Sequence, residues 1–381
     1  MHQWCKTVKL KIRFLEKYLL HRIFLPVVYQ IYRKQPVQKK LVLFADAKSD
    51  KIPFSMQAMY EEMQRQGYQV ENWCVNFDET SIKQKLKYLY KFMKRYAQAK
   101  YVFICDYFLP VSSCEKKLET KVIQLWHSCG LLKKFAYDAP DDLGAYGSSI
   151  HATKNIDLWP VSSEACVPVF EKATHLYDGQ IQALGVARTD IYFSEIYRKQ
   201  CIERFYSAYP ELKGKKLILW APTFRGNAKT AALVGVEEIL RLQSELGEGW
   251  KILIKVHPHL AQKYQLDNCK FPTEQLYPVI DLLITDYSSV VFDYMLFDKS
   301  FLIYAPDYEE YMQQRGCYID LEKKMPGGVA REYGELVQKI RSMNNKKSFE
   351  GNMKDFVTFH VSKCDGKVVN RLAGFSNFLY N

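Results

Sequence analysis

The sequence predicts an α/β protein made of two consecutive doubly wound domains that face a central cleft. Short apolar runs alternate with longer amphipathic segments from residue 40 onward, as in parallel strands joined by helices. The chain has 381 residues, more than one hydrophobic core usually accommodates. Its 27 tyrosines and 22 phenylalanines need burial to offset chain entropy, so the composition argues against disorder.

The first half of the chain is predicted to form a parallel sheet covered by helices. Amphipathic segments over residues 55–66 and 83–97 predict helices between the apolar runs. The runs themselves predict six strands, over residues 41–45, 69–75, 101–105, 122–126, 158–161 and 181–184.

The second half repeats this order after a polar helical segment, residues 195–208, and a turn over 210–214. It contains predicted helices over 236–245 and 288–297 and predicted strands over 217–220, 252–256, 282–285 and 301–304. We therefore expect a membrane-surface segment, two domains and a closing part with a helix around 367–378, with the bounds 1–38, 39–188, 189–348 and 349–381.

The positive charge of the chain is concentrated near its beginning. The formal net charge is +12, and residues 1–40 contain ten lysines or arginines against one acid, Glu16. The apolar run from Ile23 to Tyr29 is too short to cross a bilayer, which needs ~20 apolar residues. A basic amphipathic segment instead lies in the headgroup layer, where each basic residue gains about 1 kcal/mol from anionic lipid.

A second basic segment, Lys83 to Lys100, has seven basic residues and no acid. Apolar residues recur at helical spacing within it, so it also predicts a helix with one apolar face. We expect this helix to contact lipid through Lys91, Lys94 and Arg95. The alternative is that both segments cover their own domain and have a solvated outer face.

Several functional classes lack their sequence signatures. No zinc-finger spacing, RNA-recognition signature or glycine-arginine tract is present, so we expect no nucleic-acid partner. No D-x-D, Walker loop or carboxylate cluster occurs, so we expect no metal or cofactor. The ten cysteines form no C-x-x-C pair, which favours reduced thiols in the cytoplasm.

Polar residues follow several of the predicted strands, where ligands bind in open parallel sheets. Lys255 and His257 lie two positions apart, which places them on one face of a strand. Lys133 and Lys134 are expected in the helix after the fourth strand. The other polar residues at strand ends are His127 and Ser128, Thr223 and Arg225, and Asp286 followed by Ser288 and Ser289.

The junction after Asp286 is predicted to bind an anion. Ser288 and Ser289 begin the predicted helix, where backbone N–H groups and the helix dipole attract phosphate. Arg225 and Lys255 from neighbouring strands would add the positive charge that a pyrophosphate needs. Taken singly, the serines and Asp286 could be helix caps, and Arg225 could pair with a surface carboxylate.

The two histidines are predicted to have different roles. His127 lies in the first domain, on the expected lipid side, where an acceptor hydroxyl arrives, and histidine suits a general base near neutral pH. His257 lies among the cations of the second domain and would stabilise charge on the donor phosphates. Either could instead be a structural hydrogen-bonding group.

Five motifs occur in a fixed order along the chain: LWHSCGLLKKFAYD (125–138), APTFRGN (221–227), IKVHPH (254–259), TDYSSVVFDY (285–294) and DYEEYMQQRGCYID (307–320). Their order resembles that of the CDP-glycerol glycerophosphotransferase family of teichoic acid synthesis. The resemblance implies a GT-B-like fold of two Rossmann-like domains, a CDP-glycerol or CDP-ribitol donor, and release of CMP. It also implies an undecaprenyl-diphosphate-linked acceptor and a peripheral location at the cytoplasmic face of the membrane.

By the same resemblance, His127 matches the catalytic base, and His257, Arg225, Asp286, Ser288 and Ser289 match donor-phosphate positions. Two departures from the family pattern affect the loops. Ser-Cys-Gly replaces Gly-Thr-Pro after His127, so acceptor contacts differ, and Gly-Val-Ala-Arg ending at Arg188 replaces Gly-x-Pro-Arg at the domain junction.

Two other functions are consistent with the same pattern. A sugar-nucleotide glycosyltransferase or epimerase of this fold would also use histidines at strand ends and serines at a helix start. A membrane-bound polymer-binding scaffold with a decayed site is the third possibility. Retention of the histidines, Arg225, Lys255 and the serines argues against decay.

Overall fold

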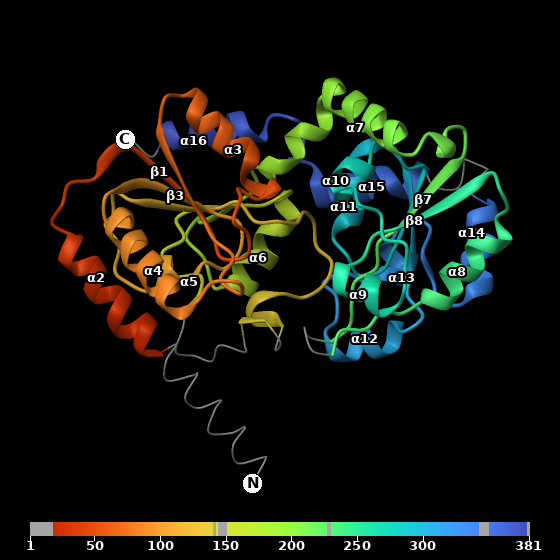
Figure 1. Cartoon of the computed structure of the whole chain (residues 1–381), viewed down its shortest axis with the longest axis horizontal. Helices are drawn as coiled ribbons and strands as arrows, with labels where there is room; N and C mark the ends of the chain where they lie inside the picture. The colour runs from red at the N-terminus through yellow and green to blue at the C-terminus, as the bar shows by residue number, and fades with distance from the viewer. Residues whose placement is uncertain (1–17, 140–141, 144–150, 227–229, 343–349, 379–381) are drawn as a thin grey trace, which may run out of the picture.

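The computed structural model describes residues 18–139, 142–143, 151–226, 230–342 and 350–378. Figure 1 shows two bodies side by side, each built around its own sheet. We call the body around the four-stranded sheet lobe 1 and the body around the five-stranded sheet lobe 2. Residues 1–17 of the predicted membrane-surface segment lie outside the described residues. The domain bounds predicted from the sequence stay predictions.

The sheet of lobe 1 is parallel throughout and has the strand order β2-β1-β3-β4. A short parallel pair, β5 and β6, is joined to its edge by a bridge between Ile123 and Leu158. All six predicted strands are confirmed, most of them with shifted ends. Their bounds are β1 Gln38–Asp46, β2 Gln69–Cys74, β3 Ala99–Ile104, β4 Lys121–Gln124, β5 Trp159–Pro160 and β6 Ile181–Gln182.

Alternate residues of β1 enter two different cores, because successive side chains of a strand point to opposite faces. Leu41 and Leu43 pack with helices on one face, and Val42 and Phe44 pack with helices on the other. The first face carries α2 Leu25–Tyr32, α4 Ile82–Tyr96, α5 Leu109–Ser112 and α6 Val167–Thr174, and the second carries α3 Phe54–Arg65 and α16 Val368–Phe378. A short π-helical segment, Leu20–Phe24, precedes α2.

Lobe 2 contains a second parallel sheet with the order β11-β10-β9-β7-β8. The four predicted strands are confirmed as β7 Lys216–Trp220, β8 Trp250–Ile254, β9 Leu282–Thr285 and β10 Ser300–Tyr304. The sequence did not predict β11 Val329–Ala330, because two residues are too few to produce a period.

The helices of lobe 2 lie on both faces of this sheet (Figure 1). The predicted helix over 288–297 is shorter than expected, because the α-helix ends at Tyr294 and continues as a 3₁₀ turn over Met295–Phe297. The α-helices are α7 Glu195–Ala208, α8 Val236–Glu245, α9 Pro258–Lys263, α10 Thr273–Leu276, α11 Val290–Tyr294, α12 Tyr308–Gln314, α13 Leu321–Lys324, α14 Tyr333–Ser342 and α15 Glu350–Val361.

The end of the chain connects the two lobes. Helix α15 packs Phe356 and Val361 into the core of lobe 2. Helix α16 then returns to lobe 1, where Val368 and Leu372 are buried beside α3. The predicted closing helix is therefore present, and it closes onto lobe 1.

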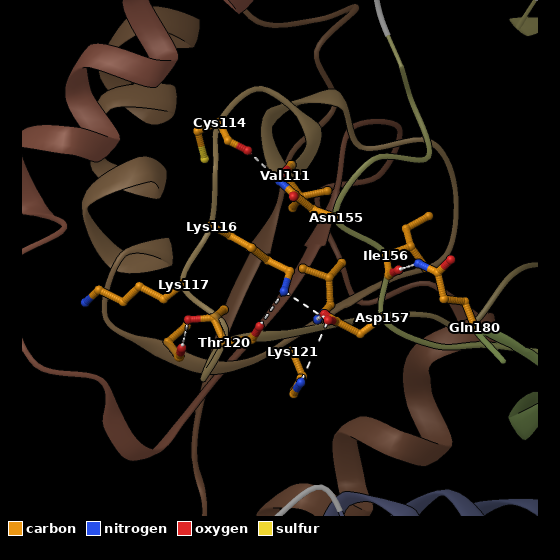
Figure 2. Close-up of polar contacts among 12 residues, drawn as sticks. Val111, Cys114, Lys116, Lys117, Thr120, Lys121, Asn155, Ile156, Asp157 and Gln180 are labelled. Atoms are coloured by element: carbon orange, nitrogen blue, oxygen red, sulfur yellow. Dashed lines mark hydrogen bonds and ion pairs between the residues drawn. The ribbon is translucent and has the colours of Figure 1, made fainter. Parts of the chain in front are cut away.

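The loop that leads into β4 is anchored by a polar network (Figure 2). The carboxylate of Asp157 accepts hydrogen bonds from the backbone N–H of Val122 at 2.7 Å and from the Lys116 ammonium at 3.0 Å. The Asn155 side-chain amide donates to the carbonyl oxygens of Val111 in α5 and Cys114 in the loop, both at 2.7 Å. This network fixes the start of the strand that places His127.

Candidate active site

A cavity of about 660 Å³ lies between the lobes. Its lining includes His127, Ser128 and Lys133 from lobe 1 and Ser289 from lobe 2. The structure therefore brings these four predicted residues together. The predicted donor residues Thr223, Arg225, Asp286 and Ser288 are not among the lining residues of this cavity. Tyr318 and Arg315, in the loop after α12, complete the lobe 2 side.

The imidazole of His127 is oriented by the backbone of the neighbouring strand. Its Nδ1 lies 3.1 Å from the carbonyl oxygen of Cys105. When Nδ1 carries the proton and donates to this oxygen, Nε2 is left unprotonated and can accept a proton. Trp126 before it has a φ of 55°, which is strained for a large side chain, and its ring centroid lies 4.2 Å from that of His127.

The environment of His127 favours its neutral form. The side chain is exposed within the cavity. The protein around the cavity reduces the solvation of the charged ring, and this lowers its pKa below the ordinary value. The charges of Arg188 and Lys48 also lower this pKa, whereas the carboxylate of Asp106 and the Cys105 carbonyl raise it. Asp106 and Lys48 form an ion pair and both line the cavity.

The loop after His127 is held by lobe 2. The thiol of Cys129 lies 3.5 Å from the carboxylate of Asp293 in α11. Gly130 has a φ of 65°, and a Cβ atom there would come within 2.6 Å of the Phe292 ring. The backbone N–H of the next residue, Leu131, donates to a side chain of α15. This loop therefore couples the position of His127 to lobe 2.

The prediction that Lys133 and Lys134 lie in a helix is wrong. Lys133 forms a β-bridge with Cys317, and the carbonyl oxygen of Lys134 accepts a hydrogen bond from Arg315 at 3.1 Å. Pairing with the extended loop of lobe 2 replaces the hydrogen bonds that a helix would form. Lys133 lines the cavity, whereas Lys134 is not among its lining residues.

Arg225 is fixed by two carboxylates in lobe 2. Its guanidinium lies 2.9 Å from Asp286 and 2.5 Å from Asp307. It also lies over the stacked rings of Tyr287 and Tyr311, at 4.9 and 5.1 Å from their centroids. Asp286 directly follows β9 and Asp307 is the N-cap residue of α12, so lobe 2 presents a cation that is held in one orientation.

Asp286 connects the ends of two neighbouring strands of lobe 2. It is buried, and it accepts hydrogen bonds from the backbone N–H groups of Thr223 at 2.8 Å and Tyr287 at 2.6 Å. Burial raises its pKa, and the charge of Arg225 opposes that effect. Thr223 and Asp286 therefore join the ends of β7 and β9.

The expectation that Lys255 and His257 share one face of a strand is wrong. Strand β8 ends at Ile254, and His257 is the residue that caps α9, because Pro258 begins that helix. The ammonium of Lys255 donates to the carbonyl oxygen of Cys269 at 2.9 Å. His257 is exposed, and neither residue lines the cavity that contains His127.

Ser288 and Ser289 precede α11 and do not belong to its α-helical turns. Helix α11 has five residues and therefore a weak dipole, so the predicted anion site would depend more on the serine hydroxyls. Ser289 lines the cavity, and the Ser288 hydroxyl lies 3.5 Å from the N–H of Val290.

Sequence reasoning missed a buried ion pair between the lobes. The guanidinium of Arg188 lies 2.6 Å from the carboxylate of Asp293, and both side chains are almost fully removed from solvent. Arg188 ends the Gly-Val-Ala-Arg departure at the junction, and Asp293 lies within a recognised motif, but nothing in the sequence pairs them. Asp106 was also not predicted as a site residue. It directly follows a predicted strand, where a polar residue indicates a ligand site.

Within the described ranges, no cluster of three or more His, Cys, Asp or Glu side chains has the geometry of a metal site. Over the same part of the chain, no helix is both long enough and apolar enough to span a bilayer.

The apolar face predicted for the helix over 83–97 is mostly covered by its own lobe. Leu89 and Met93 are buried in the core, whereas Leu86 and Tyr90 remain exposed. Arg95 forms an ion pair with Glu71. The inner face of α4 therefore covers its own domain, as the alternative interpretation predicts, and only the outer edge of the helix is exposed.

Known proteins resemble the chain over most of its length. A teichoic acid ribitol-phosphate primase of Bacillus spizizenii is 30% identical, with 90% of this chain and 92% of the primase covered. A teichoic acid poly(ribitol-phosphate) polymerase of the same organism is also 30% identical, with 94% of this chain but 59% of the polymerase covered.

Solved structures confirm the two-lobed GT-B-like fold. The wall teichoic acid polymerase TagF has a TM-score of 0.74 at 20% sequence identity, with 100% of this chain and 97% of that chain covered. A histidine-to-asparagine variant of TagF soaked with CDPG has a TM-score of 0.72 at 19% identity, with 99% and 97% covered. The sequence profile of the CDP-Glycerol:Poly(glycerophosphate) glycerophosphotransferase family matches residues 27–375. The chain belongs to this family.

Proposed function

We propose that the chain transfers a polyol phosphate from a CDP-alditol to a hydroxyl group of a lipid-linked wall teichoic acid precursor and releases CMP. Family membership supports the donor and the type of reaction. The observation that carries the proposal is the single cavity that contains His127 from lobe 1 and Ser289 from lobe 2. Such a cavity can hold an acceptor and a donor against each other.

His127 is the general base of the proposed reaction. Its Nε2 takes the proton of the acceptor hydroxyl, and the acceptor oxygen attacks the phosphorus that carries the polyol. The bond from this phosphorus to the bridging oxygen of the diphosphate breaks, and CMP leaves with that oxygen. The Cys105 carbonyl supports this role because it holds the Nδ1 side of the ring.

Lobe 2 holds the donor phosphates in this proposal. Arg225 is preoriented by Asp286 and Asp307, so little side-chain order is lost when it binds a phosphate. Ser288 and Ser289 supply hydroxyl donors at the start of α11. Lys255 adds positive charge and His257 a ring hydrogen-bonding group after the end of β8, and the donor would bridge from them to the cavity.

The acceptor side of the proposal includes an anionic membrane surface. Ile23, Val27 and Ile31 lie four residues apart along the segment that ends in α2, and their exposed fractions are 52%, 53% and 64%. The adjacent helix α4 exposes Leu86 and Tyr90 with the same spacing. We call these five residues the apolar ridge.

Basic residues accompany the apolar ridge. Lys91 and Lys94 are exposed on α4, and Arg22 is exposed beside Ile23. Tyr32 and Tyr90 contact each other through their hydroxyl groups, which joins the two helices into one surface. An apolar strip with flanking cations suits the interface of an anionic bilayer, where a peripheral enzyme meets an undecaprenyl-diphosphate-linked acceptor.

A donor panel tests the proposed reaction. The protein is incubated with CDP-glycerol, CDP-ribitol or UDP-sugars in the presence of a lipid-linked disaccharide, and the released nucleotide is identified. We expect CMP release that depends on the acceptor. Release of UDP alone would instead identify a sugar-nucleotide glycosyltransferase and would contradict the proposal.

A further inference from the structure

A second cavity, of about 370 Å³, lies in lobe 2 between α13 and α15. None of its lining residues lines the cavity that contains His127. We call it the α13–α15 cavity, and its size suits a small molecule. Its lining includes Lys323 and Lys324 from α13 and Asp355, Phe356, Phe359 and His360 from α15.

His360 is held in one tautomer at the wall of the α13–α15 cavity. Its Nδ1 accepts a hydrogen bond from the backbone N–H of Leu131 at 3.2 Å, so the proton of the neutral ring is on Nε2. Burial lowers the pKa of this ring to about 3, which keeps it neutral near neutral pH. The residue is 1% exposed, and its Nε2 has no hydrogen-bond partner among the described residues. An N–H group with so little access to water gains free energy when a ligand oxygen accepts its hydrogen bond.

Two phenylalanine rings of α15 flank the His360 ring. The imidazole centroid lies 4.3 Å from that of Phe356 and 4.9 Å from that of Phe359. Phe356 is buried, whereas Phe359 is 49% exposed although its ring lines a cavity. An exposed aromatic ring of this kind stacks on flat heterocycles, because every nucleobase has a π-face.

The charged residues of the α13–α15 cavity favour an anion. Lys324 is exposed and forms no ion pair within the described part of the chain. Lys323 is paired with Asp320 at the start of its own helix, and an exposed pair of this kind is weak. Two neighbouring ammonium groups suit a phosphate. Asp355 adds one acceptor, which suits an amino or hydroxyl group of the same ligand.

We propose that the α13–α15 cavity binds a pyrimidine nucleoside monophosphate. Its base stacks on Phe359, its ring carbonyl oxygen accepts from the Nε2–H of His360, and its phosphate lies toward the two lysines. The amino or hydroxyl groups of such a ligand can donate to Asp355. CMP is the member of this class that the proposed reaction releases, and the choice of CMP as ligand rests on that proposed function.

His360 connects this cavity with the loop that follows His127. Its Nδ1 accepts from Leu131, and its ring centroid lies 4.7 Å from that of Phe292, which covers Gly130. A hydrogen bond from Nε2–H polarises the imidazole and strengthens the acceptor at Nδ1. Nucleotide in the α13–α15 cavity therefore acts on the candidate active site through one imidazole.

The Nε2–H group of His360 provides a local measurement of binding. The full chain is prepared with isotope-labelled histidine, and the His360 NMR signal is assigned by its loss in His360→Gln. CMP, AMP and inorganic phosphate are then titrated separately. We expect CMP to move this signal, and we expect AMP and phosphate to bind about tenfold more weakly, because adenine lacks a carbonyl oxygen and phosphate lacks a base.

Two variants test the walls of the α13–α15 cavity. Lys324→Gln removes one phosphate contact, and Phe359→Leu keeps an apolar side chain but loses the aromatic ring. We expect each to raise the dissociation constant of CMP about fivefold, as measured on the His360 signal. Lys354→Gln is the matched control, because Lys354 is also exposed on α15 but does not line the cavity. It should bind CMP like the parent.

Three results would overturn this site. They are a His360 signal that CMP does not move, equal affinities for CMP and either other probe, and unchanged CMP affinity in Lys324→Gln. Failure of the proposed function looks different. If CMP binds in a way that depends on Lys324 but is not released from CDP-glycerol, the nucleotide site stands and the proposed reaction is wrong.

Discussion

The Nδ1 atom of His127 lies 3.1 Å from the carbonyl oxygen of Cys105, so a backbone group of β3's end orients the imidazole at the end of β4. Many catalytic histidines are oriented by a carboxylate instead. Here the carboxylate of Asp106 belongs to the next residue and is paired with Lys48. The Cys105 carbonyl therefore orients the His127 ring, whereas Asp106 and Lys48 supply the charges near it. Variants of Asp106 and Lys48 test the effect of charge alone.

The pH dependence of transfer should follow the lowered pKa of His127. Reduced solvation within the cavity disfavours the protonated ring, so kcat/KM should fall only as the pH drops below 6.5. Asp106→Asn removes a charge that raises this pKa and should move the acid limb to lower pH. Lys48→Met removes a charge that lowers it and should move the limb to higher pH.

The His127 pKa can be measured independently of activity by NMR titration of the imidazole. Shifts of opposite sign in the two variants are expected. Shifts of the same sign, or none, would show that these charges do not act on His127.

Substitution of Arg225 should affect donor use. Arg225→Lys keeps the charge but loses the planar geometry that Asp286 and Asp307 hold. We expect KM for CDP-glycerol to rise about tenfold, in line with one lost charge-assisted interaction. Arg241→Lys, in an exposed i,i+4 pair on α8, is the control and should behave like the parent. An unchanged KM in Arg225→Lys would exclude Arg225 from donor binding.

Serine and histidine variants test the same side of the site. Ser289→Ala should weaken donor use by a few-fold because it removes one hydroxyl that lines the cavity. His257→Ala should also weaken it if the donor reaches the end of β8. Full activity of His257→Ala would restrict the donor site to Arg225 and the serines.

The apolar ridge should determine vesicle binding. We expect Ile23→Ser with Val27→Ser, or Lys91→Gln with Lys94→Gln, to reduce cosedimentation with phosphatidylglycerol vesicles, the second pair most strongly at low salt. Ile196→Ser is a matched control, because Ile196 is 70% exposed on α7 of lobe 2. Cosedimentation of all variants at the parent level would show that the apolar ridge and the two lysines do not bind the membrane.

Stability should decrease in acid through His360. Burial lowers its pKa from 6.5 to about 3, so below pH 6.5 the unfolded chain binds a proton that the folded chain does not. Stability from this source is full above pH 6.5 and falls by about 2 kcal/mol between pH 6.5 and 5.0. The free energy of unfolding, measured in urea at each pH, should fall more steeply with decreasing pH in the parent than in His360→Gln. Parallel pH profiles would contradict it.

The strands were predictable because each has its own local pattern. Leu41 to Ala45 and Leu217 to Trp220 are apolar runs that become buried on both faces, and the sequence shows them directly. That His127 and Ser289 line one cavity was also predictable, since ligands bind outside the carboxyl ends of parallel strands and both residues follow such ends.

The remaining features depend on partners that are distant in sequence. The residues around Lys133 favour a helix, but Lys133 forms a β-bridge with Cys317 of lobe 2. The Arg188–Asp293 ion pair forms only when the lobes meet, and neither residue reveals its partner. Local patterns therefore predict the elements, whereas contacts between lobes need the structure.

In the proposed reaction, an imidazole from lobe 1 deprotonates the acceptor while lobe 2 holds the donor. It is tested most directly by measuring acceptor-dependent CMP release and CDP-glycerol affinity in His127→Ala. We predict that release is lost while donor affinity stays within about twofold of the parent, because His127 acts on the acceptor. CMP release at the parent rate would contradict the account.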